Sequence, residues 1–181
     1  EHTARLVTQV GPETKKAIQT VIRDAFELAS PPRKAAMPIR ELVGLTERDA
    51  KAVMNYWRTV AQDGNVSAKR ANEMADAYSQ KLLRRRAENI ARTETNNEGV
   101  GGTQLSWGQA QGRGLILPGS MQEWIAAVES TRTCKVCLDL DSQKVPLGQP
   151  FYSSITGQFY SGPTAHPSCR CAVSLFTAIP S

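Results

Sequence analysis

Four cysteines and one histidine near the C-terminus have the types and the spacing of metal ligands. Cys134 and Cys137 are separated by two residues, and after 28 intervening residues His166, Cys169 and Cys171 follow. Two cysteines at this spacing on a turn present both thiolates to one ion, and a sulfur-rich tetrahedral set suits Zn2+ best. Five candidates compete for four positions, and Cys169 and Cys171 would share one face if they lie on a strand. The sequence therefore predicts a structural Zn2+ that holds this segment together.

The same cysteines allow three other interpretations. They could form disulfides, although nothing in the sequence indicates secretion. Cys134 and Cys137 could be a redox dithiol, although no thioredoxin-like strand–helix–strand pattern surrounds them. All four could also be reduced core residues without a metal. Structural zinc is the interpretation that the spacing favours.

Few residues offer the acid–base chemistry of an enzyme. The chain has two histidines, His2 and His166, and neither begins the His-x-Glu pattern of zinc deaminases or a His-Glu-x-x-His pattern. A catalytic zinc would also need an open position beside a general base. The glycines at 99, 101 and 102 follow a helical pattern rather than a strand, so they do not form a phosphate-binding loop. We expect a protein that is not an enzyme.

The first half of the chain has the apolar periodicity of helices. A helix is expected to open at Gly11-Pro12-Glu13, and the stretch from Ser30 to Pro38 is expected to be a linker. A second helix is expected from the capping residue Thr46 to the Asp63-Gly64-Asn65 break. Ser67 is expected to cap a third helical stretch, either one helix or two joined near Arg84–Arg86, which ends or loosens at the glycines of 99–102 because glycine disfavours helix.

Beyond Leu115, short runs punctuated by Pro, Gly and Ser replace the helical pattern. Met121–Val128 and Cys171–Phe176 are strand candidates. The predicted fold class is α+β, a helical N-terminal part followed by a small zinc-knuckle-like α/β module with short antiparallel strands. The expected division is an N-terminal helix and linker at 1–38, a helical region at 39–114 and a Cys/His-containing module at 115–181.

Positive charge is concentrated in the first half. The chain carries 22 Lys and Arg against 17 acidic residues, net +5, of which residues 1–98 contribute +4 from 17 bases and 13 acids. The densest run is Arg84, Arg85 and Arg86, which is a candidate contact for nucleic acid or an acidic protein surface. A solvated helix face is the alternative that the sequence favours.

Length and composition exclude several classes of protein. A chain of 181 residues with 40% hydrophobic and 22% charged residues can form one or two globular domains. No run approaches the ~18 apolar residues of a membrane span, and the chain is neither a disulfide-rich mini-protein nor a coiled-coil rod. It begins Glu1-His2 without methionine, which indicates a piece trimmed from a longer protein.

Several segments, taken in order, resemble the bacteriophage Mu F-like minor head proteins, the phage head-morphogenesis domain. They are Arg86-Ala-Glu-Asn-Ile-Ala-Arg-Thr-Glu-Thr95, Trp124, Thr131-Arg-Thr-Cys-Lys-Val-Cys137 and Pro163-Thr-Ala-His-Pro-Ser-Cys-Arg-Cys171. The resemblance covers about residues 40–176. It implies a minor capsid protein, structural rather than catalytic, that acts in head morphogenesis near the portal. The implied partners are the portal and major capsid proteins, with phage DNA as a further candidate and no membrane in the assembled head. The implied location is the virion, after assembly in the host cytoplasm.

Three residues of these segments are expected to have structural roles. Trp124 is expected in the core rather than stacked on a base. Arg92 or Glu94 is expected to be buried against the C-terminal module and to bridge helix and strand, the alternative being an exposed pair that contributes less than ~1 kcal/mol.

Two other functions of the protein stay open, a DNA-binding zinc module and a toxin-like enzyme of the ADP-ribosyltransferase or nuclease type.

Overall fold

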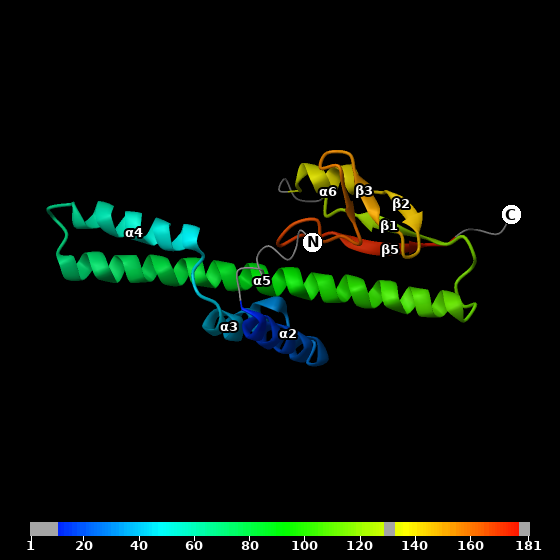
Figure 1. Ribbon diagram of the computed structural model, residues 1–181, viewed down its shortest axis with the longest axis horizontal. Helices are drawn as coiled ribbons and strands as arrows, with labels where there is room; N and C mark the ends of the chain where they lie inside the picture. The colour runs from blue at the N-terminus through cyan, green and yellow to red at the C-terminus, as the bar shows by residue number, and fades with distance from the viewer. Residues whose placement is uncertain (1–10, 129–132, 178–181) are drawn as a thin grey trace. The chain divides into compact units, whose positions relative to one another are not determined.

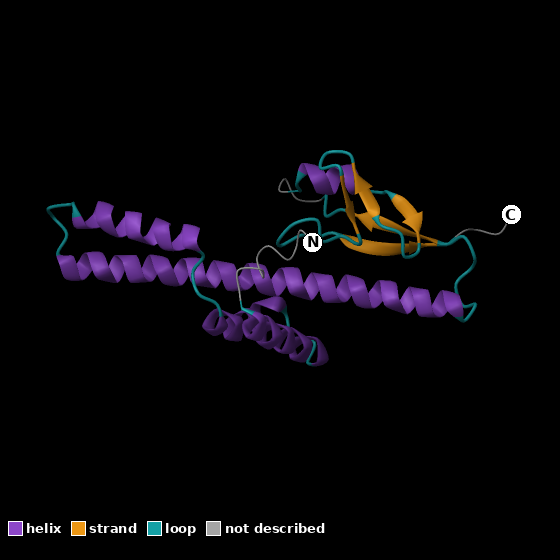
Figure 2. Ribbon diagram, viewed as in Figure 1, coloured by secondary structure: helices purple, strands orange, loops and turns teal. Residues whose placement is uncertain are grey.

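A computed structural model describes residues 11–128 and 133–177 of the chain (Figure 1). The described chain divides into two compact units, with the boundary between residues 92 and 93. The dividing point lies inside one long helix, whereas the sequence places the start of the C-terminal module at residue 115. The expected α+β class is confirmed, with helices first and short antiparallel strands after them (Figure 2).

The first unit is helical. Its elements are α2 (Pro12–Glu27), α3 (Pro32–Leu42), α4 (Glu47–Ala61) and the first part of α5 (Ala68–Gly112). Pro12 opens α2 at the first turn, and Thr46 caps α4 by accepting a hydrogen bond from the Asp49 amide at 3.0 Å, as expected. One apolar cluster joins α2, α3 and α5; its buried members include Ile18, Ile22, Ile39 and Ile90.

The predicted linker up to Pro38 is wrong, because these residues form α3. Pro32 lies at the start of this helix, where a missing N–H is no loss, but Pro38 lies inside it. Proline at such a position removes the hydrogen bond to the Lys34 carbonyl and ordinarily breaks a helix. Lys34 and Pro38 are exposed, so water can solvate the Lys34 carbonyl, while Ala35 and Ile39 on the adjoining face of the helix are buried in the core. Burial of that face offsets the local cost.

Helix α4 pairs with the N-terminal part of α5 as a hairpin (Figure 1). Trp57 donates its indole N–H to the Asn72 side chain at 2.7 Å, and the rings of Tyr56 and Tyr78 lie 5.0 Å apart. No residue of α4 is fully buried, and Trp57 is 42% exposed. Tyr56 and Trp57 therefore contribute to the hairpin contact rather than to an enclosed core.

The third helical stretch is a single helix of 45 residues, α5, so the expected end near residues 99–102 is wrong. Gly101 and Gly102 weaken the helix locally. The helix continues past these glycines because the residues next to them make long-range contacts within the second unit. Val100 is buried, and the Gln104 side chain donates hydrogen bonds to the Ser161 carbonyl at 2.7 Å and to the Gln122 side chain at 2.9 Å.

The second unit carries the strands. A three-stranded antiparallel sheet has the order β2 (Lys144–Pro146), β1 (Met121–Ile125), β5 (Ala172–Phe176), and β3 (Phe151–Ser153) pairs with β4 (Gln158–Tyr160). Strands β1 and β5 confirm the two predicted strands, although β1 ends at Ile125. The short helix α6 (Lys135–Leu140), which the sequence analysis did not predict, packs against β3.

Trp124 is at the centre of this unit, fully buried as expected. Its ring makes edge contacts with Phe151 at 5.3 Å and with Tyr160 at 6.3 Å between centroids. Three of the four cysteines belong to the same buried cluster. Three of the five candidate metal ligands, Cys137, Cys169 and Cys171, are therefore part of the hydrophobic core of this unit.

Within the described residues, no helix has the length and apolar character needed to span a bilayer.

Candidate metal centre

The five candidate ligands come from two segments that the fold brings together. Cys134 is the N-cap of α6, and Cys137 lies in its first turn. His166, Cys169 and Cys171 lie in the loop between β4 and β5. The sequence spacing identified both segments, and the structure places their side chains within reach of one another.

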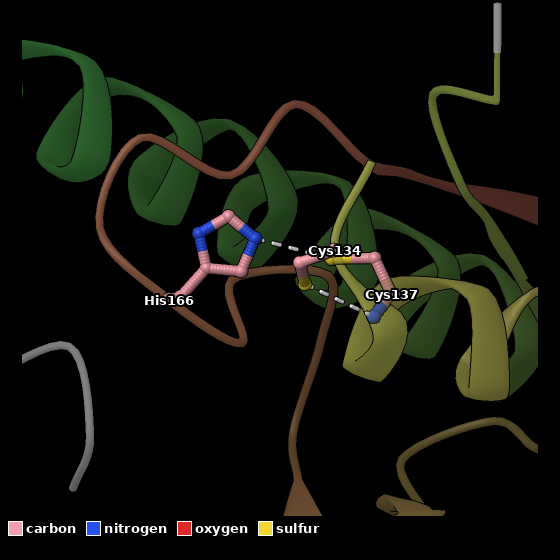
Figure 3. Close-up of side chains that lie close together, drawn as sticks. All are labelled: Cys134, Cys137 and His166. Carbon is pink, nitrogen blue, oxygen red and sulfur yellow. Dashed lines mark hydrogen bonds between the residues drawn. The ribbon is translucent and has the colours of Figure 1, made fainter. Parts of the chain in front are cut away.

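The first group of donor atoms consists of Cys134, Cys137 and His166, all within 4.8 Å of one another (Figure 3). The Cys137 amide donates to Cys134 Sγ at 3.3 Å, which fixes the turn between the two thiols. His166 Nε2 lies 3.3 Å from Cys137 Sγ, and His166 Nδ1 lies 2.9 Å from the Pro167 carbonyl oxygen. Because a carbonyl only accepts, Nδ1 is the donor in that contact, and Nε2 is the ring nitrogen placed to bind a metal.

The second group consists of Cys137, Cys169 and Cys171, also within 4.8 Å and all buried. Cys137 Sγ lies 3.8 Å from Cys169 Sγ. Neither Cys169 nor Cys171 lies in a strand, since β5 begins at Ala172, so the shared strand face considered for them does not apply. They meet Cys137 because the loop turns at Ser168, whose φ is +59°, and the Cys169 amide bonds to the His166 carbonyl at 3.1 Å.

All four cysteines are free thiols, so the disulfide interpretation does not describe this structure. Hydrogen bonds to Cys169 and Cys171, together with burial, raise the pKa of Cys137. Hydrogen bonds from Cys137 and Cys169 lower the pKa of Cys171, and the Ala127 amide and the Trp124 indole act in the same direction. Protons shared in these hydrogen bonds link the thiols of the cluster. A cation bound there would take the place of those protons.

A cavity of about 90 Å³ opens beside the thiols. Its lining contains Cys134, Cys137, His166 and Cys171, together with Ala127, Thr133, Ser168 and Arg170. None of these described lining residues is a carboxylate. The donor set is therefore sulfur and imidazole, and the cluster can bind a metal ion.

The donor spacing is consistent with a single ion. With metal–sulfur bonds of ~2.3 Å, two thiolates on one tetrahedral ion lie ~3.8 Å apart. The Cys137–Cys169 separation matches that spacing, and the other donors lie within 4.8 Å in their groups. Because Cys137 belongs to both groups, an ion bound to its Sγ would lie close to donors of each group.

Two supporting residues were missed by the sequence analysis. The Ser168 amide donates to Thr93 Oγ1 at 2.9 Å, which ties the ligand loop to α5, and Thr93 is 2% exposed. Asp141 accepts the Ala126 amide at 2.7 Å and holds the end of β1 beside α6. Thr93 lies inside the Arg-Thr-Glu segment that carries part of the resemblance, but the sequence analysis expects a role only for its charged neighbours, Arg92 and Glu94.

The three arginines of the Arg84–Arg86 run do not form one exposed surface. Arg84 and Arg85 are exposed, and Arg85 lies 3.8 Å from Asp49. Arg86 is 6% exposed and donates to the Gly44 carbonyl at 2.5 Å, so the expectation that it contacts DNA or a partner is wrong. Burial lowers the pKa of Arg86, and the nearby Asp49 opposes that shift. A helix turns successive residues to different faces, which separates the three.

Arg92 and Glu94 are both half-buried. Burial is the main cause that raises the pKa of Glu94; a hydrogen bond with the Asn97 side chain lowers it, and the charge of Glu98 raises it. The bridging role expected of Arg92 or Glu94 stays a prediction. Residues 131 and 132 of the Thr-Arg-Thr-Cys segment and His2 lie outside the described residues.

Comparison with known proteins gave no relative: no protein-family model, no curated protein and no solved structure matches this chain.

Proposed function

We propose that the chain is a structural protein of a phage head, a minor head protein of the Mu F-like type, whose C-terminal module is stabilised by a structural Zn2+. The observation that carries the proposal is the contact between Thr93 and Ser168. It joins the Arg-Thr-Glu helix segment to the His-Pro-Ser-Cys-Arg-Cys loop, which are two of the segments that carry the resemblance. Two segments whose contacting residues are 75 positions apart therefore lie side by side, and this contact supports the proposal.

Zinc is the metal that best suits the donors. Thiolate and imidazole ligands in a tetrahedral arrangement favour Zn2+ over Mg2+ or Ca2+, which take oxygen ligands. Cys134, Cys137 and His166 supply three donors, and either Cys169 or Cys171 supplies the fourth. The strands of the module are only three to five residues long. Structural zinc contributes ~10–16 kcal/mol in peptide sites, which is enough to stabilise such a small core.

A structural role fits the surroundings of the cluster better than catalysis does. A hydrolytic zinc site needs a bound water and a general base beside it. The described residues that line the cavity include no Asp or Glu. Two described carboxylates at the end of α6 have other partners: Asp139 accepts from Ser153 and Ser154, and Asp141 accepts from the Ala126 amide.

The assembly role gives the partners and the location. We propose contacts with the portal protein and the major capsid protein, in the virion after assembly in the host cytoplasm. Phage DNA is a further candidate partner, for which Arg84 and Arg85 are the exposed cations of the basic run. If these residues bind DNA phosphates, affinity will fall steeply as salt rises.

Two measurements test the two parts of this proposal. Elemental mass spectrometry of the purified chain is expected to give about one zinc per chain, and chelation is expected to lower the melting temperature sharply. Mass spectrometry of purified heads from the strain that encodes the chain is expected to detect it at low copy number. Heads that lack the protein and still assemble normally without it would refute the assembly role, and a metal-free chain with an unchanged melt would refute the zinc.

A further inference from the structure

The metal centre has one donor more than a tetrahedral ion takes. Cys134, Cys137 and His166 form one group of neighbouring donors, and Cys137, Cys169 and Cys171 form another. Cys137 alone belongs to both groups. An ion bound to the first group through Cys137 therefore meets two further thiols, and a fourth position can be filled by only one of them.

The first group has the features of fixed ligands. The amide of Cys137 holds Cys134 Sγ, and the Pro167 carbonyl fixes the orientation of the His166 ring, so that Nε2 points toward Cys137. Outer hydrogen bonds of this kind orient ligands before the metal arrives. These three donors need little rearrangement to bind an ion.

Two residues are candidates for the fourth ligand of the ion, and a different contact supports each of them. Cys169 has its Sγ 3.8 Å from Cys137 Sγ, and its amide is bonded to the carbonyl of the ligand His166. Cys171 lines the cavity beside the first group, which Cys169 does not. Both thiols are buried, at 6% and 3% exposure, so neither is directed into solvent.

We infer that Cys169 and Cys171 are alternative fourth ligands of one ion, and that the thiol that is not bound to the ion stays next to the site. This inference rests on the proposed zinc site. It predicts that the site keeps its ion when either thiol is lost, and that the ion can exchange between them without leaving the first group. A fixed four-ligand site would instead depend on one of the two thiols and ignore the other.

The test compares Cys169→Ser, Cys171→Ser, the double variant and Cys137→Ser in the full chain. Zinc affinity is measured by competition with a chromophoric chelator, and the number of bound thiolates by the charge-transfer absorption of the Co2+ form. Each single variant is expected to bind one ion through three thiolates, with affinity reduced less than about tenfold. The double variant and Cys137→Ser are expected to lose more than the ~10–100-fold typical of an outer-shell partner.

The other outcomes overturn either this inference or the proposed zinc site. If one single variant matches the double variant and the other matches the unmodified chain, the ligand set is fixed and this inference is wrong. It is also wrong if both single variants match the double variant, or if the double variant binds normally. If the unmodified chain binds no zinc, the proposed zinc site itself fails. A serine variant that does not fold is replaced by the matching alanine variant, which leaves the same comparison.

Discussion

The continuation of α5 past its glycines depends on a contact that can be tested directly. Val100 on the helix lies against Gly162 in the loop after β4. A methyl group added at Gly162 would lie 2.5 Å from Val100 Cγ1, whereas ordinary contacts begin at about 3.4 Å. Gly162 does not have a positive φ, and the Gln104 side-chain atoms would lie at 3.4 and 3.5 Å from the added methyl, so the main obstacle to Gly162→Ala is the Val100 side chain.

The magnitude follows from the overlap. Overpacking of this kind costs ~1–3 kcal/mol, and Gly162→Ala is expected to lower the free energy of unfolding by that amount. Val100→Ala removes two buried carbon groups at ~0.8 kcal/mol each, or about 1.6 kcal/mol. In the double variant the new methyl has room, so its cost should be close to that of Val100→Ala alone, a coupling of ~1–3 kcal/mol.

The assay is urea unfolding followed by the fluorescence of the buried Trp124, with Trp57 and Trp107 changed to Phe in every protein compared. Gly102→Ala is the matched control, because nothing lies within 4 Å of a methyl group there. That control is expected to raise the free energy of unfolding by ~1 kcal/mol, the helix preference of Ala over Gly. If Gly162→Ala costs as much in the Val100→Ala background as it does when Val100 is present, the packing argument is refuted.

Two further predictions concern charged residues. Asp139 accepts hydrogen bonds from Ser154 and Ser153, which lower the pKa of its carboxyl below the ordinary 3.8. Its stabilising effect is therefore complete well above pH 3.8 and is lost as the pH falls through the lower, folded-state pKa. The melting temperature of Asp139→Asn should consequently fall less steeply than that of the unmodified chain on acidification, and parallel curves would contradict this. Arg86→Ala should destabilise by ~1.5–3 kcal/mol through the lost bond to a carbonyl, whereas Arg84→Ala should change stability by less than ~0.5 kcal/mol; equal effects in thermal or urea unfolding would contradict the burial of Arg86.

The candidate site was largely predictable because metal ligands are marked by residue type and spacing. For a cysteine pair such as Cys134 and Cys137, the spacing of two intervening residues is enough to predict that both thiols lie on the same side of a short turn. The partner loop could be identified by its own Cys and His residues. Its approach to Cys137 could not be derived, because the turn at Ser168 and its bond to Thr93 join segments far apart in the chain.

Errors in the predicted fold arose where local preference and long-range burial disagree. Pro38 and the glycines at 101 and 102 are helix breakers by local preference, yet all three lie inside helices. Ile39 and Val100 are buried beside them, and burial of an aliphatic side chain contributes ~1.5–3 kcal/mol, more than a glycine costs and comparable with a proline. A short stretch of sequence shows the helix-breaking residue, but it does not show the distant surface against which the adjacent side chain is buried, so the local preference alone predicts the wrong structure.

The sequence by itself determined the residues that can bind a metal, the helical character of the first half and the strands β1 and β5. These features depend on residue type, spacing and periodicity, which are local. The tertiary structure decided that α3 and α5 continue through their helix-breaking residues, that Arg86 is buried while Arg84 is exposed, and that Cys137 lies within 4.8 Å of both Cys169 and Cys171. Each of these depends on which distant surfaces meet, and burial and hydrogen bonding between such surfaces are set by the whole fold.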